Sequence, residues 1–132
     1  MLDLGLHVMV VDDNVINREV AVKAIPLADE FEPEDLEQAR ARFFREAEMA
    51  GRLSHPHIVT IYDAGEDRGT AYIAMELLRG QHLVEYTSPV QRLPTAVALE
   101  IVARLADALH YAHQNQVVHR DIKPANIMFH AP

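Results

Sequence analysis

Residues 119–126 read HRDIKPAN, a polar stretch that lies between two short apolar segments, residues 117–118 and 127–129. It brings a carboxylate at Asp121, an ammonium group at Lys123 and an amide at Asn126 close together in the chain. One interpretation is a polar turn in which the Asp and Asn side chains cap neighbouring backbone groups. The other is a reactive loop.

The stretch resembles the catalytic loop of the eukaryotic-like protein kinases. Lys123 follows the Asp by two residues, as in the serine/threonine subgroup. The resemblance implies that Asp121 accepts the proton of a substrate hydroxyl, that Lys123 neutralises charge on the transferred phosphoryl group, and that Asn126 ligates Mg²⁺. It is closest to bacterial Hanks-type, membrane-anchored serine/threonine kinases with separate sensor regions, over about residues 13–130. ATP, Mg²⁺ and a protein substrate with Ser or Thr are therefore expected.

The same resemblance assigns roles to residues upstream of this loop. Lys23 in VAVK is similar to the strand lysine that pairs the α- and β-phosphates, and Glu46 is similar to its partner on the following helix. Met75 is the expected gatekeeper, followed by an adenine-binding hinge. The resemblance implies a nucleotide-binding set of Val8, Ala21, Lys23, Met75, Glu76, Leu77, Leu78 and Met128. Read singly, Lys23 and Glu46 fit solvated charges and Met75 and Met128 fit ordinary core. Their order relative to the catalytic loop favours the nucleotide-binding interpretation.

The order of predicted elements favours the α+β class. Residues 6–11 and 19–25 are short β-branched runs around the turn formers DDNVIN, and they predict a hairpin. Apolar residues at three- and four-residue steps predict a helix from the acidic stretch 29–35 to near Ser54. Two antiparallel strands follow, with 65–69 as their turn, and then a long helix over 94–115. We expect a small lobe and hinge over 1–78 and the start of a large lobe over 79–132.

The composition restricts the classes of partner. The chain of 132 residues carries a net charge of −8, which argues against a nucleic-acid surface because such surfaces need Lys and Arg. It has no cysteine, and its longest apolar run is interrupted by charges, so no membrane span is predicted. The N-terminus lacks the features of a secretory signal, and a cytoplasmic location is expected. His55 and His57 have the spacing of two metal ligands on a strand, but without further convergent ligands a turn is favoured.

A second family resemblance competes at the N-terminus. The apolar residues before Asp12 and Asp13 are similar to the opening of a response-regulator receiver domain, where such a pair helps to hold Mg²⁺. A receiver domain alternates strands and helices regularly, with a phosphorylated Asp at the end of its third strand. Asp63 is the nearest candidate by position, but the predicted antiparallel strands around it disagree. The receiver interpretation is therefore the weaker one.

The sequence departs from the kinase pattern at both ends. A glycine-rich loop is expected before Lys23, and Val8 stands where its valine would be, but Gly5 is out of register and Leu6 occupies a position that favours a small residue. The chain ends shortly after the catalytic loop, before the family's Mg²⁺-binding DFG aspartate, so we expect no useful kinase activity from it alone. The alternative is a non-catalytic module that binds nucleotide or associates with kinases. An exposed face on the 94–115 helix would favour self-association.

Overall fold

The computed structural model describes residues 9–13 and 18–129, and side chains from Glu19 onward. Contacts divide the chain into two compact units. The first contains the residues up to Ser54 together with Ile58–Leu77, and the second contains His55–His57 together with the residues from Leu78 onward. Each unit is described by itself below. The three residues His55–His57 thus belong with a part of the chain that follows them by more than twenty positions in sequence.

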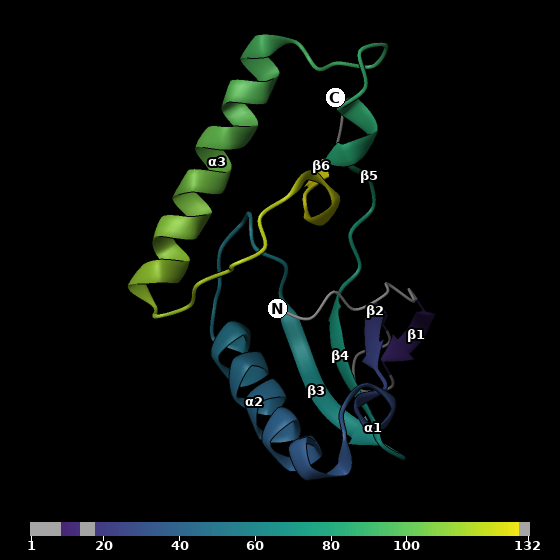
Figure 1. Cartoon of the computed structure of the whole chain (residues 1–132). Coiled ribbons are helices and arrows are strands. Elements are labelled where there is room, and N and C mark those ends of the chain that lie inside the picture. Colours follow the sequence, from purple (N-terminus) through teal and green to yellow (C-terminus); the bar gives the residue numbers. More distant parts are fainter. Residues whose placement is uncertain (1–8, 14–17, 130–132) are drawn as a thin grey trace. The chain divides into compact units, whose positions relative to one another are not determined.

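The first unit is built on a four-stranded sheet with strand order β1-β2-β4-β3 (Figure 1). Its strands are β1 (Met9–Asp13), β2 (Arg18–Ile25), β3 (Ile61–Asp67) and β4 (Thr70–Glu76). All three pairings are antiparallel. The predicted α+β class and kinase-like small lobe are confirmed, and the receiver interpretation is wrong, because a receiver sheet is built from parallel strands joined by helices.

The predicted first hairpin is present, but its strands extend further than expected. Asp12 and Asp13 lie inside β1 and pair with Glu19 and Arg18, whereas they were expected in the turn. The pairing of β-strand backbones does not depend on a side chain's preference for turns, so the ladder continues through both aspartates. The expected turn and the predicted nucleotide-binding residue Val8 lie outside the described residues.

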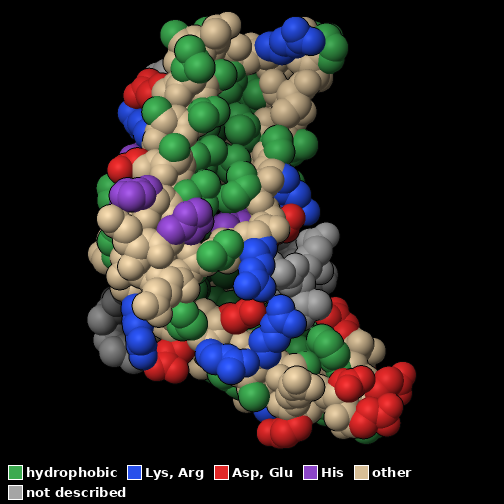
Figure 2. Space-filling model, turned by 60° about the vertical axis from the view of Figure 1, so that its left-hand side comes forward, with side chains coloured by type: hydrophobic (Ala, Val, Ile, Leu, Met, Phe, Trp, Pro, Cys, Tyr) green, Lys and Arg blue, Asp and Glu red, His purple; other side chains and the backbone are tan. Residues whose placement is uncertain are grey.

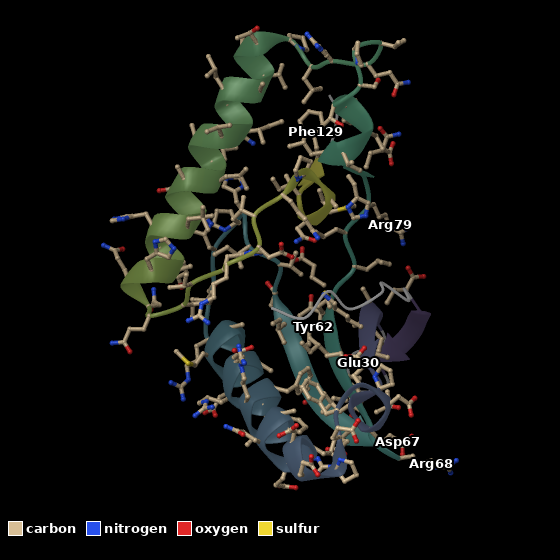
Figure 3. The ribbon with its side chains drawn as sticks, viewed as in Figure 1. Glu30, Tyr62, Asp67, Arg68, Arg79 and Phe129 are labelled. Atoms are coloured by element: carbon tan, nitrogen blue, oxygen red, sulfur yellow. The ribbon has the colours of Figure 1, made fainter. Side chains whose placement is uncertain are left out.

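The turn between β3 and β4 is tighter than predicted. Gly65 and Glu66 belong to β3, and only Arg68 and Gly69 form the turn, with φ angles of 51° and 80°. Two residues with positive φ form the type of turn whose twist matches an antiparallel hairpin. Arg68 stands at the tip of the hairpin, where its side chain points away from the sheet (Figure 3). The side chain of Tyr72, the cross-strand partner of Gly65, occupies the space where a side chain at position 65 would lie. This strand position therefore requires glycine.

Two helices accompany the sheet where one was predicted. The helix α1 (Leu27–Glu30) is short, and α2 (Pro33–Gly51) is the long amphipathic helix. Proline biases the residue before it toward extended backbone, and Glu32 accordingly has φ −63° and ψ 151°, which separates the two helices. The helix α2 ends at Gly51, before the predicted end at Ser54, and Leu53 is buried beyond it.

The core of the first unit lies between the sheet and the helices. Its buried cluster is Ile25, Leu27, Phe43 and Ala71. The predicted helical stripe is confirmed, since Phe43 and Ala47 are buried and none of its other members is exposed. A part-buried ion pair joins α2 to β3, with Arg40 Nε 2.7 Å from Glu66 Oε2. The hydrogen bond to Glu66 is the largest of the effects that raise the pKa of Arg40, so this guanidinium is charged throughout the neutral range.

The second unit contains one long helix and a small two-stranded sheet. The helix is α3 (Thr95–Gln114), and β5 (Gln81–His82) pairs with β6 (Met128–Phe129) in antiparallel fashion (Figure 1). Two single-turn 3₁₀ helices, η1 (Leu83–Tyr86) and η2 (Pro124–Asn126), flank the strands. The ring of Phe129 meets that of Tyr86 edge to face, with centroids 5.7 Å apart. Among the described residues, none of the helices combines the length and the apolarity needed to cross a membrane.

Apolar side chains remain exposed on α3. Its apolar stripe, read from the sequence, includes Val102, Ala108 and Ala112. Val102 is 60% exposed, whereas Ala108 and Ala112 are buried, and Leu99, outside the stripe, is 64% exposed. Figure 2 shows hydrophobic side chains gathered along this helix, with histidines toward one end of the band. The expectation that part of the stripe is exposed is therefore confirmed. Self-association through this face stays a prediction.

Candidate catalytic loop and nucleotide-binding strands

The path from α3 into the candidate loop is set by the end of the helix. Gln116 has φ 66°, and the N–H of Val117 donates to the carbonyl of Ala112 at 2.9 Å. Helices commonly end with a residue in the left-handed conformation, followed by a backbone hydrogen bond back to the last turn. The Asn115 side chain also donates to the Tyr111 carbonyl at 2.9 Å. The chain thus leaves α3 in a fixed direction immediately before residues 119–126.

The three polar residues of the loop are brought together. Asn126 Nδ2 lies 2.9 Å from the main-chain oxygen of Asp121 and 3.1 Å from its Oδ2. Lys123 Nζ lies 3.6 Å from the same Oδ2. The Asp121 side chain is 32% and the Lys123 side chain 41% exposed, so both remain within reach of a substrate. A carboxylate, an ammonium group and an amide therefore converge in one part-exposed cluster, as the residue pattern predicts.

Backbone geometry holds the carboxylate in position. Arg120, directly before Asp121, has φ 69°, in the left-handed region. A residue other than glycine costs about 1–3 kcal/mol in such a conformation and keeps it only where its surroundings require it. The N–H of Asp121 donates to His119 Nδ1 at 3.1 Å, and the Asn126 N–H donates to the Lys123 carbonyl at 2.9 Å. His119 was part of the recognised motif, but its role as an acceptor for the loop backbone was not predicted.

The loop is followed directly by β6, which positions Met128. Met128 pairs with His82 of β5, and the N–H of Leu83 donates to the carbonyl of Ile127 at 2.8 Å. These bonds attach the segment after the loop to the start of η1. Among the described side chains, His82 Nδ1 is buried without a hydrogen-bond partner. Leu78, the last predicted hinge residue, belongs to the same unit as the loop.

The predicted nucleotide-binding residues of the first unit lie on two neighbouring strands. Ala21 pairs directly with Met75, and Lys23 pairs with Ile73. Directly opposite residues share a face of a sheet, and alternate residues along a strand do the same. Ala21, Lys23 and Met75 are therefore on one face, the face to which Ile25 and Ile73 also belong. Glu76 ends β4, and Leu77 follows it in the same unit.

Glu46 has a partner on its own helix. Arg42 Nε donates to Glu46 Oε1 at 3.1 Å, and both side chains are more than half exposed. Pairs at this helical spacing contribute little, about 0.2–0.5 kcal/mol. Glu46 is therefore held weakly by Arg42. Its pairing with Lys23 stays a prediction.

The comparisons with known proteins agree with this geometry. The protein kinase domain family matches residues 7–132. The chain is 42% identical over 122 residues to the serine/threonine-protein kinase PrkC of Bacillus subtilis, covering 92% of this chain and 18% of that protein. It is 41% identical over 120 residues to the serine/threonine-protein kinase PknB of Mycobacterium leprae, covering 88% and 19%.

Solved structures show the same likeness. A crystal structure of a variant of the Mycobacterium tuberculosis PknI kinase domain superposes with a TM-score of 0.75 and 36% identity, covering 95% of this chain and 50% of that one. A second crystal structure of the PknI kinase domain gives a TM-score of 0.68 and 39% identity, covering 84% and 43%. The chain belongs to the protein kinase domain family, and its relatives are bacterial serine/threonine kinases. It spans about half the length of these crystallised domains and under a fifth of PrkC and PknB.

Proposed function

We propose that this chain provides the nucleotide-binding strands and the catalytic loop of an ATP-dependent protein serine/threonine kinase. The observation that carries the proposal is the convergence of Asp121, Lys123 and Asn126, with the amide of Asn126 donating to Asp121 Oδ2 at 3.1 Å. In phosphoryl transfer, the protein contributes mainly positioning and charge stabilisation, and little covalent chemistry. A cluster with one base, one cation and one neutral oxygen donor supplies those functions.

Each side chain of the cluster has one task in this proposal. The carboxylate of Asp121 accepts the proton of the Ser or Thr hydroxyl while the hydroxyl oxygen bonds to the γ-phosphorus and the bond to ADP breaks. The ammonium group of Lys123 balances the charge on the transferred phosphoryl group. Lys23, on β2, pairs the α- and β-phosphates, and Glu46 orients it.

The side-chain amide oxygen of Asn126 is a suitable ligand for Mg²⁺. Its Nδ2 makes both bonds to Asp121, so its Oδ1 is the atom suited to a cation. Among the described residues, no group of three or more His, Asp or Glu side chains could hold a metal by itself. Mg²⁺ commonly takes one or two protein oxygens together with phosphate oxygens and water, so a single amide oxygen here is sufficient only when nucleotide is bound. Bound Mg²⁺ neutralises phosphate charge. Because ATP is the donor, we place the domain in the cytoplasm.

Nucleotide binding is tested by the melting temperature of the chain with and without Mg²⁺-ATP. A ligand at a hundred times its Kd stabilises a protein by roughly 2.7 kcal/mol, so a clear upward shift is expected. Lys23→Ala should remove the shift, whereas Arg45→Ala, on an exposed position of α2, should keep it. No shift with the unmodified chain, measured up to millimolar nucleotide, would contradict nucleotide binding.

Transfer is tested separately, in the whole protein that contains this chain. Radiolabelled γ-phosphate from ATP should appear on serine and threonine of a protein substrate, and Asp121→Asn should abolish that labelling without removing the thermal shift. Binding without labelling in that unmodified protein would instead indicate a non-catalytic module.

A further inference from the structure

The helix α3 carries apolar residues on two sides. One side is turned into its own unit, where Ala108 and Ala112 are buried. The other side carries a second set at four- and three-residue steps, here called the outer stripe: Leu99, Ala103 and Ala106, with Val102 at its edge. All four are exposed, and Figure 2 shows apolar side chains gathered along this helix. A surface helix usually has polar residues on its outer face, so the outer stripe is a candidate contact surface.

A pair of opposite charges lies beside the outer stripe. Arg104 Nη2 and Glu100 Oε1 form an ion pair within the helix, and the two side chains are 57% and 60% exposed. An exposed pair of this kind is held weakly, so both groups are able to exchange partners with a neighbouring molecule. The surface thus offers one negative and one positive group, four positions apart.

A second copy of the chain complements both features when its helix runs antiparallel. If two such helices pack around a two-fold axis near residue 102, Leu99 of each copy faces Ala103 of the other. A large side chain opposite a small one allows the two stripes to interdigitate. Glu100 then faces Arg104 of the other copy, whereas a parallel pair would place each glutamate beside its own counterpart, with like charges together. The outer stripe is therefore self-complementary in the antiparallel orientation.

We propose that the outer stripe is a self-association site, where two copies of this chain pair antiparallel, with Leu99 packed against Ala103 and Glu100 paired with Arg104 across the two-fold axis. None of these four residues belongs to the proposed nucleotide-binding or catalytic set, so the inference is independent of the proposed function. The stripe is short, and interfaces that bury little surface are weak. The dimer therefore forms as the chain is concentrated, and dilute samples, such as those used for unfolding, contain the monomer.

The oligomeric state is measured by sedimentation equilibrium from micromolar to millimolar concentrations of the chain. The average mass should rise with concentration from that of one chain toward that of two. Val102→Asp places two carboxylates near the axis and should raise the dissociation constant of the dimer by about a hundredfold. Val90→Asp is the matched control, because Val90 is 91% exposed and lies outside α3, and this variant should still dimerise. Circular dichroism confirms that both variants are folded.

The orientation is tested by oxidising variants with a single cysteine, because the chain has no cysteine of its own. Ala103→Cys places the two thiols near the axis and should give a disulfide-linked dimer. His110→Cys is the control on the same helix, at another exposed position. In the antiparallel pair its two copies lie about 24 Å apart along the helices, which is too far for a disulfide.

Three results would overturn the inference. A chain that stays monomeric at millimolar concentration leaves a different segment or partner as the cover of the outer stripe. A dimer that a folded Val102→Asp variant retains is formed through another surface. Disulfide formation by both cysteine variants indicates a parallel pair and contradicts the antiparallel arrangement. Nucleotide binding is measured separately, and its failure would leave the self-association site untouched.

Discussion

The side-chain amide of Asn126 donates to both the main-chain oxygen and Oδ2 of Asp121, at 2.9 and 3.1 Å. Two bonds from one amide fix the carboxylate relative to the backbone that carries it. Both bonds come from Nδ2, so Asn126 Oδ1 takes no part in the contact with Asp121. The orientation of the candidate base and the cation site are thus determined by one side chain.

Asn126→Leu is therefore expected to lower phosphoryl transfer by the protein that contains this chain by about a hundredfold, because displacements near 1 Å at a reacting group have effects of that size. The measurement is kcat at saturating Mg²⁺-ATP. Asn115→Ala is the matched control, since Asn115 also donates its amide to a backbone carbonyl, but at the end of α3. We expect Asn115→Ala to leave kcat unchanged. If the Asn126→Leu variant has the same kcat as the unmodified protein, Asp121 is positioned by contacts other than its bonds to Asn126.

Gly65→Ala should destabilise the chain by about 1–3 kcal/mol, because a Cβ at this position would lie 2.3–2.9 Å from the outer atoms of the Tyr72 ring. Urea denaturation followed by circular dichroism measures the difference. Gly51→Ala is the control, because nothing lies within 4 Å of its added Cβ, and alanine is favoured over glycine in a helix. It should be neutral or slightly stabilising. Equal effects of the two substitutions would argue against close packing of Tyr72 on Gly65.

Ile25→Val is expected to cost about 0.5–1.5 kcal/mol, since Ile25 is fully buried in the core cluster and the substitution removes one methylene. Val102→Ala removes apolar atoms from a side chain that is 60% exposed and should stay within about 0.5 kcal/mol of the unmodified chain. Both are measured by urea denaturation. A larger effect at Val102 than at Ile25 would mean that this face of α3 is covered in solution, for example by a second copy.

Arg40→Met should lower the melting temperature more than Arg42→Met. The Arg40 and Glu66 side chains are 30% and 22% exposed and join α2 to β3, whereas Arg42 and Glu46 are 59% and 55% exposed and lie on one helix. Because hydrogen bonding to Glu66 raises the pKa of Arg40, the stability from its charge is present below the unfolded-state pKa and is lost only above it, at strongly alkaline pH. The difference between the variants should therefore be constant from pH 7 to 9. If the difference in melting temperature between the two variants disappears between pH 7 and 9, a group other than Arg40 that titrates in this range causes it.

The loop at 119–126 could be identified from sequence because its residues match, in order and spacing, the catalytic loop that it resembles. The structure brings Asp121, Lys123 and Asn126 together. The stripe of α2 was predictable for a different reason, since burial of one helix face imposes a period near 3.6 residues. Both features depend on residues close to one another in sequence.

Features that depend on the exact pairing of one strand with another could not be predicted. Gly65 was assigned to a turn because glycine is common there, whereas it lies in β3 under the ring of Tyr72. Asp12 and Asp13 favour turns, but the pairing with residues 18 and 19 keeps them in β1. The bond from Thr60 to the Glu76 carboxylate depends on strand register, which a single sequence does not specify.

His55 links the connection after α2 to α3. Its Nε2 lies 3.1 Å from Asp107 Oδ2, its Nδ1 accepts from the His57 N–H at 3.0 Å, and its ring lies 5.2 Å from that of Tyr111. As a result, the chain passes from one compact unit to the other after Ser54, again after His57 and a third time after Leu77. No single cut can therefore separate the two units into intact halves. A fragment that stops at Leu77 keeps the His55 ring, which is only 10% exposed at its side chain here, but loses the helix that covers it. Without α3, the ring of His55 loses its contacts with Asp107 and Tyr111 and becomes more exposed to water.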